Sequence, residues 1–375
     1  MLTSTELAGP LTTSHILQTS FPALDAASGA SIIGEHAIHV IPQGNEPRWI
    51  ILGDPRKALP VLSSWRPYTM SSRLQWSAVR FATSITMLSR LPGVVNSSAR
   101  IDFSYWQRNL PEFSERWTPV VHLGTPSHTR KVIVFFLGED QLVKAVAKVP
   151  LAPAAALAIL NEASVLDCMR AAEYLPKILF QDSERGVTAQ SWLDGKPASR
   201  EFTSAHVDLL SFLANPDSKT RVYDYRAEIS AQLDSLDMPF DRSVLAQALE
   251  LLNFDEPLHG FVEHRDFAPW NLKWLPDGSL GLLDWEWAVP NGLPWQDACR
   301  FFYLNDVHFD GPGRVWEAMN ANHLLRIYRQ RFEIPPAALP ALSMHYLLRV
   351  LCMDWQSGSP HIAQYTFRQL QLLLV

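Results

Sequence analysis

The pattern of apolar residues changes at about residue 195 from strand-like to helix-like, and that change limits the folds that the chain can adopt. Between residues 116 and 194 short, apolar, β-rich runs surround one helical stretch at 154–172. From residue 195 to 375 the pattern is helical with proline interruptions, apart from short strands that flank residues 264–271. This order predicts an α+β protein, in which a small antiparallel sheet carrying one helix precedes a larger helical lobe.

The region before residue 116 has a pattern of its own. Residues 1–30 are rich in Ser, Thr, Ala and Gly, and we expect them to be loosely ordered. Residues 31–115 are predicted to form an N-terminal α/β module of unknown role. In this module β-branched runs predict strands at 36–42 and 48–52, and helical spacing predicts a helix at 71–88.

The stretch that follows this helix, up to residue 111, is predicted to be a connection, because it shows no regular apolar spacing. Its proline-glycine pair at 92–93 ends the helical pattern.

Composition excludes several classes of protein. A hydrophobic share of 47% with 19% charged residues is typical of a globular chain. The net charge of -6 and the pI of about 6.1 predict neither a nucleic-acid partner nor an anionic membrane. We find no secretory signal and no apolar run of membrane-spanning length, so a cytoplasmic location is expected.

Three polar residues carry the clearest chemical signal. Asn271 follows Asp266 by five positions, and Asp284 follows Asn271 by thirteen. Phosphoryl transfer needs one acid to orient the attacking hydroxyl, and an amide and a second acid to hold magnesium. The spacing therefore predicts Asp266 as the catalytic base, with Asn271 and Asp284 as the magnesium ligands.

A predicted hairpin brings the two metal ligands together. The apolar runs Leu272–Leu275 and Leu280–Leu283 flank Pro276–Gly278, which is a strong turn signal. The hairpin places Asn271 and Asp284 on neighbouring strand ends, close enough to share a metal ion.

A lysine and a glutamate upstream are candidates for the nucleotide site. Lys148 ends a predicted strand just before Pro150, and Glu162 lies on the helix that follows. This is the order of the lysine–glutamate pair in kinase-like folds, where the lysine contacts nucleotide phosphates. Lys144 is the alternative, because it lies four residues earlier in the same strand.

Two further segments are expected to touch the nucleotide. The segment Val120–Phe136 is predicted to be a strand, a loop over the phosphates and a strand, with Gly124 and Ser127 in the loop. Gln190 and Trp192 lie where the sheet passes into the helical lobe, where backbone groups can bind an adenine edge. A surface hairpin is the alternative for the first segment.

Together these residues resemble the aminoglycoside phosphotransferase and choline kinase superfamily, which has a protein-kinase-like, two-lobed fold. The resemblance runs from about Trp117 to the C-terminus. It is most specific in Ala268–Asn271 and Asp284–Glu286, and Gly292–Pro294 followed by Asp297 adds to it. It implies an ATP-dependent phosphotransferase with an alcohol group as acceptor, using Mg²⁺ with ATP, or GTP in its place.

Carried over residue by residue, the resemblance implies that Asp266 is the base, and that Asn271 and Asp284 ligate magnesium. It implies that Lys148 contacts the phosphates and that Glu162 positions this lysine. It also implies that Asp297 supports the catalytic loop.

The sequence departs from the family at two positions. Arg265 stands where many small-molecule kinases carry glycine, and the loop at Gly124 is poor in glycine. Residues 1–115 lie outside the resemblance, so a separate module, a lid and a docking element for a protein partner are all open interpretations.

Three functions are open at this point. A small-molecule kinase is favoured over a protein kinase, because only twelve residues separate Asp284 from Asp297 and leave no long activation segment. A catalytically silent nucleotide-binding scaffold is the third reading.

For the acceptor, a sugar or glycan-derived metabolite is preferred to an aminoglycoside or an amino alcohol. A cationic acceptor needs an acidic pocket, and arginines in the helical lobe offset its acids. The acids considered are Asp306, Asp310, Glu317 and Asp354.

Overall fold

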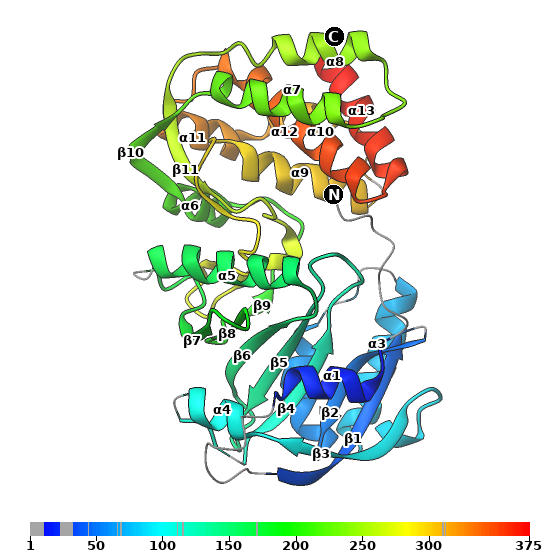
Figure 1. Cartoon of the computed structure of the whole chain (residues 1–375). Coiled ribbons are helices and arrows are strands. Elements are labelled where there is room, and N and C mark those ends of the chain that lie inside the picture. Colours follow the sequence, from blue (N-terminus) through cyan, green and yellow to red (C-terminus); the bar gives the residue numbers. More distant parts are fainter. Residues whose placement is uncertain are drawn as a thin grey trace. The chain divides into compact units, whose positions relative to one another are not determined.

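Contacts within the chain divide it at Lys196 into two units, Met1–Lys196 and Pro197–Val375 (Figure 1). The computed structural model describes residues 11–22, 33–43, 45–65, 67, 70–110, 112–114, 116–169, 172–309, 311 and 313–375. The predicted α+β organisation is confirmed, because the strands gather in the first unit and the helices dominate the second. Much of the predicted N-terminal stretch, 1–10 and 23–30, lies outside the described residues.

The first unit contains most of the strands. Its elements are α1 (Thr13–Ser20), β1 (Ile33–Gln43), β2 (Glu46–Leu52), η1 (Pro55–Ala58), α2 (Leu59–Ser64), α3 (Met70–Ser84), η2 (Leu88–Arg90), β3 (Val95–Asp102), α4 (Ser104–Asn109), β4 (Thr118–Leu123), β5 (Lys131–Leu137), β6 (Val143–Pro150), α5 (Pro153–Cys168), β7 (Ile178–Asp182) and β8 (Val187–Gln190). The strand β9 (Lys196–Pro197) straddles the boundary between the units.

One antiparallel sheet runs through the whole of this unit. Its order is β3-β1-β2-β4-β5-β6-β8-β7. An N-terminal module at 31–115 is predicted from the sequence, but β2 pairs directly with β4, and Trp49 lies opposite His122. The predicted connection before residue 111 also holds β3 and α4. The first three strands therefore extend the predicted sheet of 116–194 instead of forming a second domain.

Both faces of this sheet are covered, and all six residues of β4 are buried as a result. Because side chains alternate along a strand, Val121 packs in one core and Val120 in the other. The first core includes Trp106 of α4, and the second includes Trp49. The row across the second face runs from Trp49 through His122 towards Lys148.

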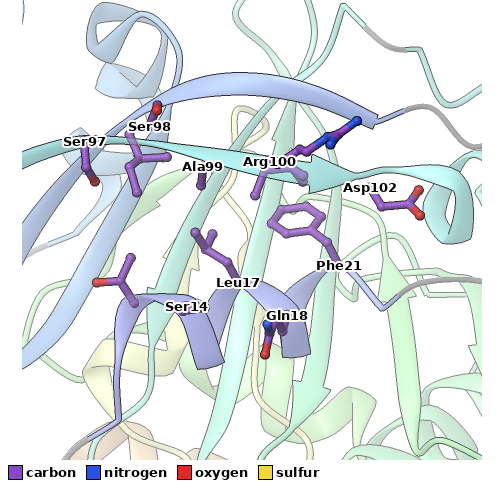
Figure 2. Close-up of a pocket in the computed structure, with 12 residues that line it drawn as sticks. Ser14, Leu17, Gln18, Phe21, Ser97, Ser98, Ala99, Arg100 and Asp102 are labelled. Carbon is purple, nitrogen blue, oxygen red and sulfur yellow. The ribbon is translucent and has the colours of Figure 1, made fainter.

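A cavity of about 660 Å³ lies between α1 and β3. Figure 2 shows Leu17 and Phe21 facing Ala99 and Arg100 across it. Its lining also includes Ile38, which belongs to the core on the sheet face opposite to Lys148. The cavity is therefore separate from the predicted nucleotide residues.

The second unit is mainly helical. Its elements are α6 (Ser204–Phe212), β10 (Ala214–Thr220), η3 (Val222–Tyr225), α7 (Arg226–Ser235), α8 (Arg242–Glu250), β11 (Leu258–Glu263), η4 (Pro269–Asn271), β12 (Leu272–Trp274), β13 (Leu280–Leu282), β14 (Val289–Gly292), α9 (Gln296–His308), α10 (Val315–Ala321), α11 (His323–Arg331), α12 (Ala338–Gln356) and α13 (Pro360–Leu374). Among the described helices of the chain, none is long and apolar enough to cross a membrane.

Two short β structures hold the predicted catalytic segment. The predicted hairpin is present, since β12 and β13 pair with Leu272 opposite Leu282. Gly278 closes its turn at φ 85°, a backbone conformation that favours glycine. The other is a three-stranded sheet, β10-β11-β14, whose strand β11 leads straight into His264.

Candidate active site

The predicted base and one predicted metal ligand are joined by hydrogen bonds. The Asn271 side-chain Nδ2 donates to the Asp266 Oδ2 at 2.8 Å and to the Asp266 carbonyl at 2.9 Å. Since both donor contacts of this amide point to Asp266, its carbonyl oxygen is the atom left to face a cation. The amide therefore fits the role of a metal ligand.

Asp297 fixes the backbone just before the base. Its two carboxylate oxygens accept the N–H groups of His264 at 2.8 Å and Arg265 at 2.9 Å. Arg265 adopts φ 66°, a left-handed conformation that costs a non-glycine residue energy. Burial, followed by the nearby Glu263 charge, raises the pKa of Asp297 to about 7. The family resemblance implies that Asp297 supports the catalytic loop, and these two hydrogen bonds match that role.

His264 ties the same loop to the end of the hairpin. Its Nδ1 accepts the N–H of Asp266 at 3.2 Å, so the proton of a neutral ring sits on Nε2. Nε2 lies 2.9 Å from the carbonyl oxygen of Leu283, and it donates there. The residue after Leu283 is Asp284, which has φ 66°. Both unusual backbone conformations are thus held in place by hydrogen bonds that are partly buried.

The hairpin brings Asn271 and Asp284 together, as predicted. The N–H of Leu283 donates to the Asn271 carbonyl at 2.9 Å, so Asp284 begins one residue beyond that bond. The part of the chain that the structure describes holds no group of three or more His, Cys, Asp or Glu side chains suited to a metal. An amide, a carboxylate and phosphate oxygens are the donors that Mg²⁺ takes in nucleotide sites, and this pair supplies the first two.

Sequence reasoning missed Arg300, which lies on α9. Its Nη2 donates to the Asp266 Oδ1 at 2.8 Å, and its Nε does so at 3.3 Å. One oxygen of the base is therefore held by a guanidinium and the other by Asn271. A signal was available, because Arg300 lies one helical turn after Asp297 and shares its side of the helix.

In the first unit, Lys148 and Glu162 form a buried ion pair. The lysine Nζ lies 2.7 Å and 2.6 Å from the two carboxylate oxygens. Only 5% of the Lys148 side chain and 2% of the Glu162 side chain are exposed. Lys144 instead pairs with Asp140 on an exposed part of the surface. The structure thus distinguishes the two lysines that the sequence leaves open, and Lys148 has the glutamate partner.

The predicted phosphate loop joins β4 to β5. A side chain at Gly124 would bring a Cβ atom to 2.9 Å from the Lys131 carbonyl oxygen, which explains the glycine there. Arg130 closes the loop by donating from Nε to the Gly124 carbonyl at 3.0 Å. Ser127 is exposed, and its hydroxyl is 3.5 Å from that of Thr129.

Gln190 and Trp192 follow the end of the sheet. Gln190 is the last residue of β8, opposite Val146, and its buried Oε1 has no hydrogen-bond partner among the described residues. The Trp192 ring meets the Phe135 ring edge-on at 5.9 Å. No contact of either residue tests the predicted role in binding adenine.

The acids proposed for a cationic acceptor are engaged elsewhere. Asp354 is buried and accepts from Thr366, and Asp306 accepts from Tyr365 and from a backbone N–H. Glu317 is exposed and pairs with an arginine. Asp310 lies outside the described residues.

Part of the chain is similar to a known family of proteins. Residues 132–333, more than half of the 375-residue chain, match the model of a phosphotransferase enzyme family. No curated protein sequence matches the chain.

Solved structures with a similar fold include choline kinase LicA from Streptococcus pneumoniae, with 13% identity over 66% of this chain and 92% of that chain, at a TM-score of 0.46. An ethanolamine kinase from Plasmodium vivax has 11% identity over 89% of this chain and 96% of its own, at 0.49. An aminoglycoside phosphotransferase from Streptomyces rimosus, solved with ADP and streptomycin, has 16% identity over 65% and 94%, at 0.40.

Proposed function

The chain belongs to the phosphotransferase enzyme family, and from this premise we propose that it transfers the terminal phosphate of ATP to a hydroxyl group of a small polar molecule. The observation that carries the proposal is the linked set of Asp266, Asn271 and Asp284. Asp297 holds the backbone on one side of this set, and the hairpin holds it on the other.

In the proposed reaction Asp266 acts on the acceptor. Its carboxylate accepts the hydroxyl proton while the hydroxyl oxygen bonds to the terminal phosphorus, and the bond from that phosphorus to the bridging oxygen of ADP breaks. Arg300 and Asn271 each hold one carboxylate oxygen, so Asp266 is oriented before the acceptor binds.

We assign Asn271 and Asp284 to a Mg²⁺ ion that arrives with the nucleotide. When bound, the ion neutralises charge on the phosphate oxygens. Lys148 is assigned to the phosphates and Glu162 to the positioning of this lysine, on the strength of their buried ion pair. ATP is the proposed nucleotide, and GTP is the alternative.

For the acceptor, we favour a sugar or a glycan-derived metabolite. Among the described acids of the helical unit that the sequence offers for a cation, Asp306 and Asp354 are bonded within the fold and Glu317 is paired with an arginine. An aminoglycoside or an amino alcohol is therefore a poorer match. A protein substrate is disfavoured because the stretch between Asp284 and Asp297 contains β14, which pairs with β11.

The test is binding first and turnover second. Calorimetry measures ATP binding with and without Mg²⁺ for the wild type and for Asp284→Ala. A coupled assay for ADP then compares the wild type with Asp266→Ala over a panel of sugars, aminoglycosides and amino alcohols. Asp255→Ala serves as the matched control, because Asp255 is an exposed acid of the same unit.

We expect magnesium-dependent binding that Asp284→Ala loses, and turnover that Asp266→Ala lowers by about 10²- to 10⁴-fold while ATP binding is kept. A wild type that binds neither ATP nor GTP refutes the proposal. Phosphoryl transfer by Asp266→Ala at the wild-type rate would show that Asp266 is not the catalytic base. Exclusive turnover of aminoglycosides overturns the preference for a sugar.

A further inference from the structure

A β-bulge in the N-terminal strands redirects one arginine. On β1, Ile41 and Pro42 are consecutive, but their partners on β2 are Trp49 and Pro47. Arg48 is therefore the extra residue of the bulge. Bulges turn a side chain out of the regular alternation, and here Arg48 leaves the face that its neighbours' spacing would give it.

The new direction of Arg48 is marked by its ring contact. Its guanidinium carbon lies 5.7 Å from the centre of the Trp65 ring. The Trp65 ring in turn contacts Trp49 at 5.7 Å and His122 at 4.9 Å. Arg48 thus lies on the sheet face of Trp49 and His122, with its guanidinium over the indole ring of Trp65.

The same face carries Lys148. Trp49 lies opposite His122, His122 opposite Ile133, and Ile133 opposite Lys148. Three strand spacings separate the two ends of this row, which is about 14 Å between backbones. Two long cationic side chains, from Arg48 and Lys148, therefore flank the β4–β5 hairpin on one face.

Arg48 also reaches the loop itself. In the β2–β4 register it is level with the last residue of β4, immediately before Gly124. Its Nη2 donates to the Thr125 hydroxyl at 3.4 Å, which is a long hydrogen bond. The guanidinium therefore lies at the loop and is joined to it by a long hydrogen bond.

The charges at this loop do not balance. Arg130 pairs with Glu46 at 2.6 Å, and no other carboxylate forms an ion pair with Arg130 or Arg48 among the described residues. Glu46 is thus taken by Arg130, and no described carboxylate pairs with Arg48. Arg48 is half-buried, and burial, together with the charge of Arg130, lowers its pKa. A half-buried cation without a counter-charge is costly unless a ligand supplies the anion.

We propose that Arg48 is a nucleotide-binding residue, whose guanidinium contacts the terminal phosphates of the nucleotide at the β4–β5 loop. The inference rests on the proposed function. It gives the N-terminal strands a part in that function, because Arg48 lies outside the matched residues 132–333. It also supplies a cation to a loop that has only one glycine, Gly124.

The experiment measures the affinities of ATP, ADP and AMP by calorimetry, in excess Mg²⁺ and without any acceptor. It compares the wild type with Arg48→Gln and Arg48→Lys. Arg116→Gln is the matched control, since Arg116 lies in the same unit and its side chain is 75% exposed. We expect Arg48→Gln to weaken ATP binding by about 10- to 100-fold and to leave AMP binding unchanged.

The ATP affinity of Arg48→Lys is expected to fall between those of the wild type and Arg48→Gln, because lysine keeps the charge but not the planar fork of donors. Arg116→Gln should match the wild type. Equal ATP affinity in Arg48→Gln and the wild type overturns the inference and leaves the proposed function standing. Equal losses for ATP and AMP also overturn it, because they indicate a change in folding. A wild type that binds no nucleotide overturns the proposed function, and the inference falls with it.

Discussion

The buried ion pair of Lys148 and Glu162 makes a quantitative test of the first unit. Glu162→Gln removes one charge and keeps the shape of the side chain, so the lysine is left buried beside a neutral amide. At 2.6 Å and an effective dielectric constant of about 20, the lost attraction is about 6 kcal/mol. Removing one partner of a buried pair costs about 3–5 kcal/mol in measured cases, and the amide oxygen still accepts one hydrogen bond. We therefore expect a loss of about 3 kcal/mol in unfolding free energy.

Hydrogen exchange measured by mass spectrometry confines the readout to this unit. Peptides from β6 and α5 report the opening of the strand and helix that carry the pair, and 3 kcal/mol corresponds to exchange about 150-fold faster. The control is the double variant Lys148→Met with Glu162→Met, which removes both charges. Apolar pairs often replace buried ion pairs at little cost, so its exchange should stay within about tenfold of the wild type.

Two results refute this reasoning. The first is exchange of Glu162→Gln at the wild-type rate, because it would mean that losing its partner does not destabilise the buried lysine. The second is exchange of the double variant as fast as that of the single variant, because it would mean that the loss came from packing and not from an unpaired charge.

Two further predictions concern the helical unit. Arg300→Gln removes the guanidinium from Asp266, so we expect kcat to fall by about 10- to 100-fold while the KM for ATP stays unchanged. Arg300→Lys should recover part of this loss. An unchanged kcat in steady-state kinetics would exclude a positioning role for Arg300. Burial raises the pKa of Asp354 to about 6, above its ordinary value of 3.8, so the folded state binds the proton more tightly than the unfolded state does. The stability from this group is present below about pH 4 and is lost as the pH rises through 6, by about 3 kcal/mol in total. Urea unfolding from pH 4 to 7 should therefore show Asp354→Asn gaining on the wild type as the pH rises, and parallel curves would contradict this.

The elements that the sequence predicted well have local signals. The strands and helix between residues 118 and 168 follow apolar runs bounded by Gly and Pro, and the hairpin at Pro276–Gly278 has a turn that permits few alternatives. The contact between Asp266 and Asn271 follows from the same local order, because the short loop between them leaves little freedom. The roles of these residues in catalysis stay predictions.

The pairing of the N-terminal strands with the rest of the sheet could not be predicted from the sequence, for a different reason. The pairing of Trp49 with His122 joins residues that are far apart in the chain, and periodicity carries no information about such partners. The strand β3 was missed because its residues from Val95 to Ser98 are exposed at the sheet edge, so it shows no apolar alternation. The bulge at Arg48 is likewise a property of the pairing and not of either strand alone.

The continuous sheet has a consequence for where this protein can be shortened. A chain that began near residue 116 would start with β4, whose six residues are all buried and whose outer edge normally bonds to β2. It would expose that edge to neighbouring molecules and uncover Phe136, which packs against Trp106. The start of the family match at residue 132 is thus a boundary of sequence similarity but not of folding. Shorter versions cut there should aggregate, and the smallest soluble piece with an intact Lys148–Glu162 pair should include β1, β2 and β3.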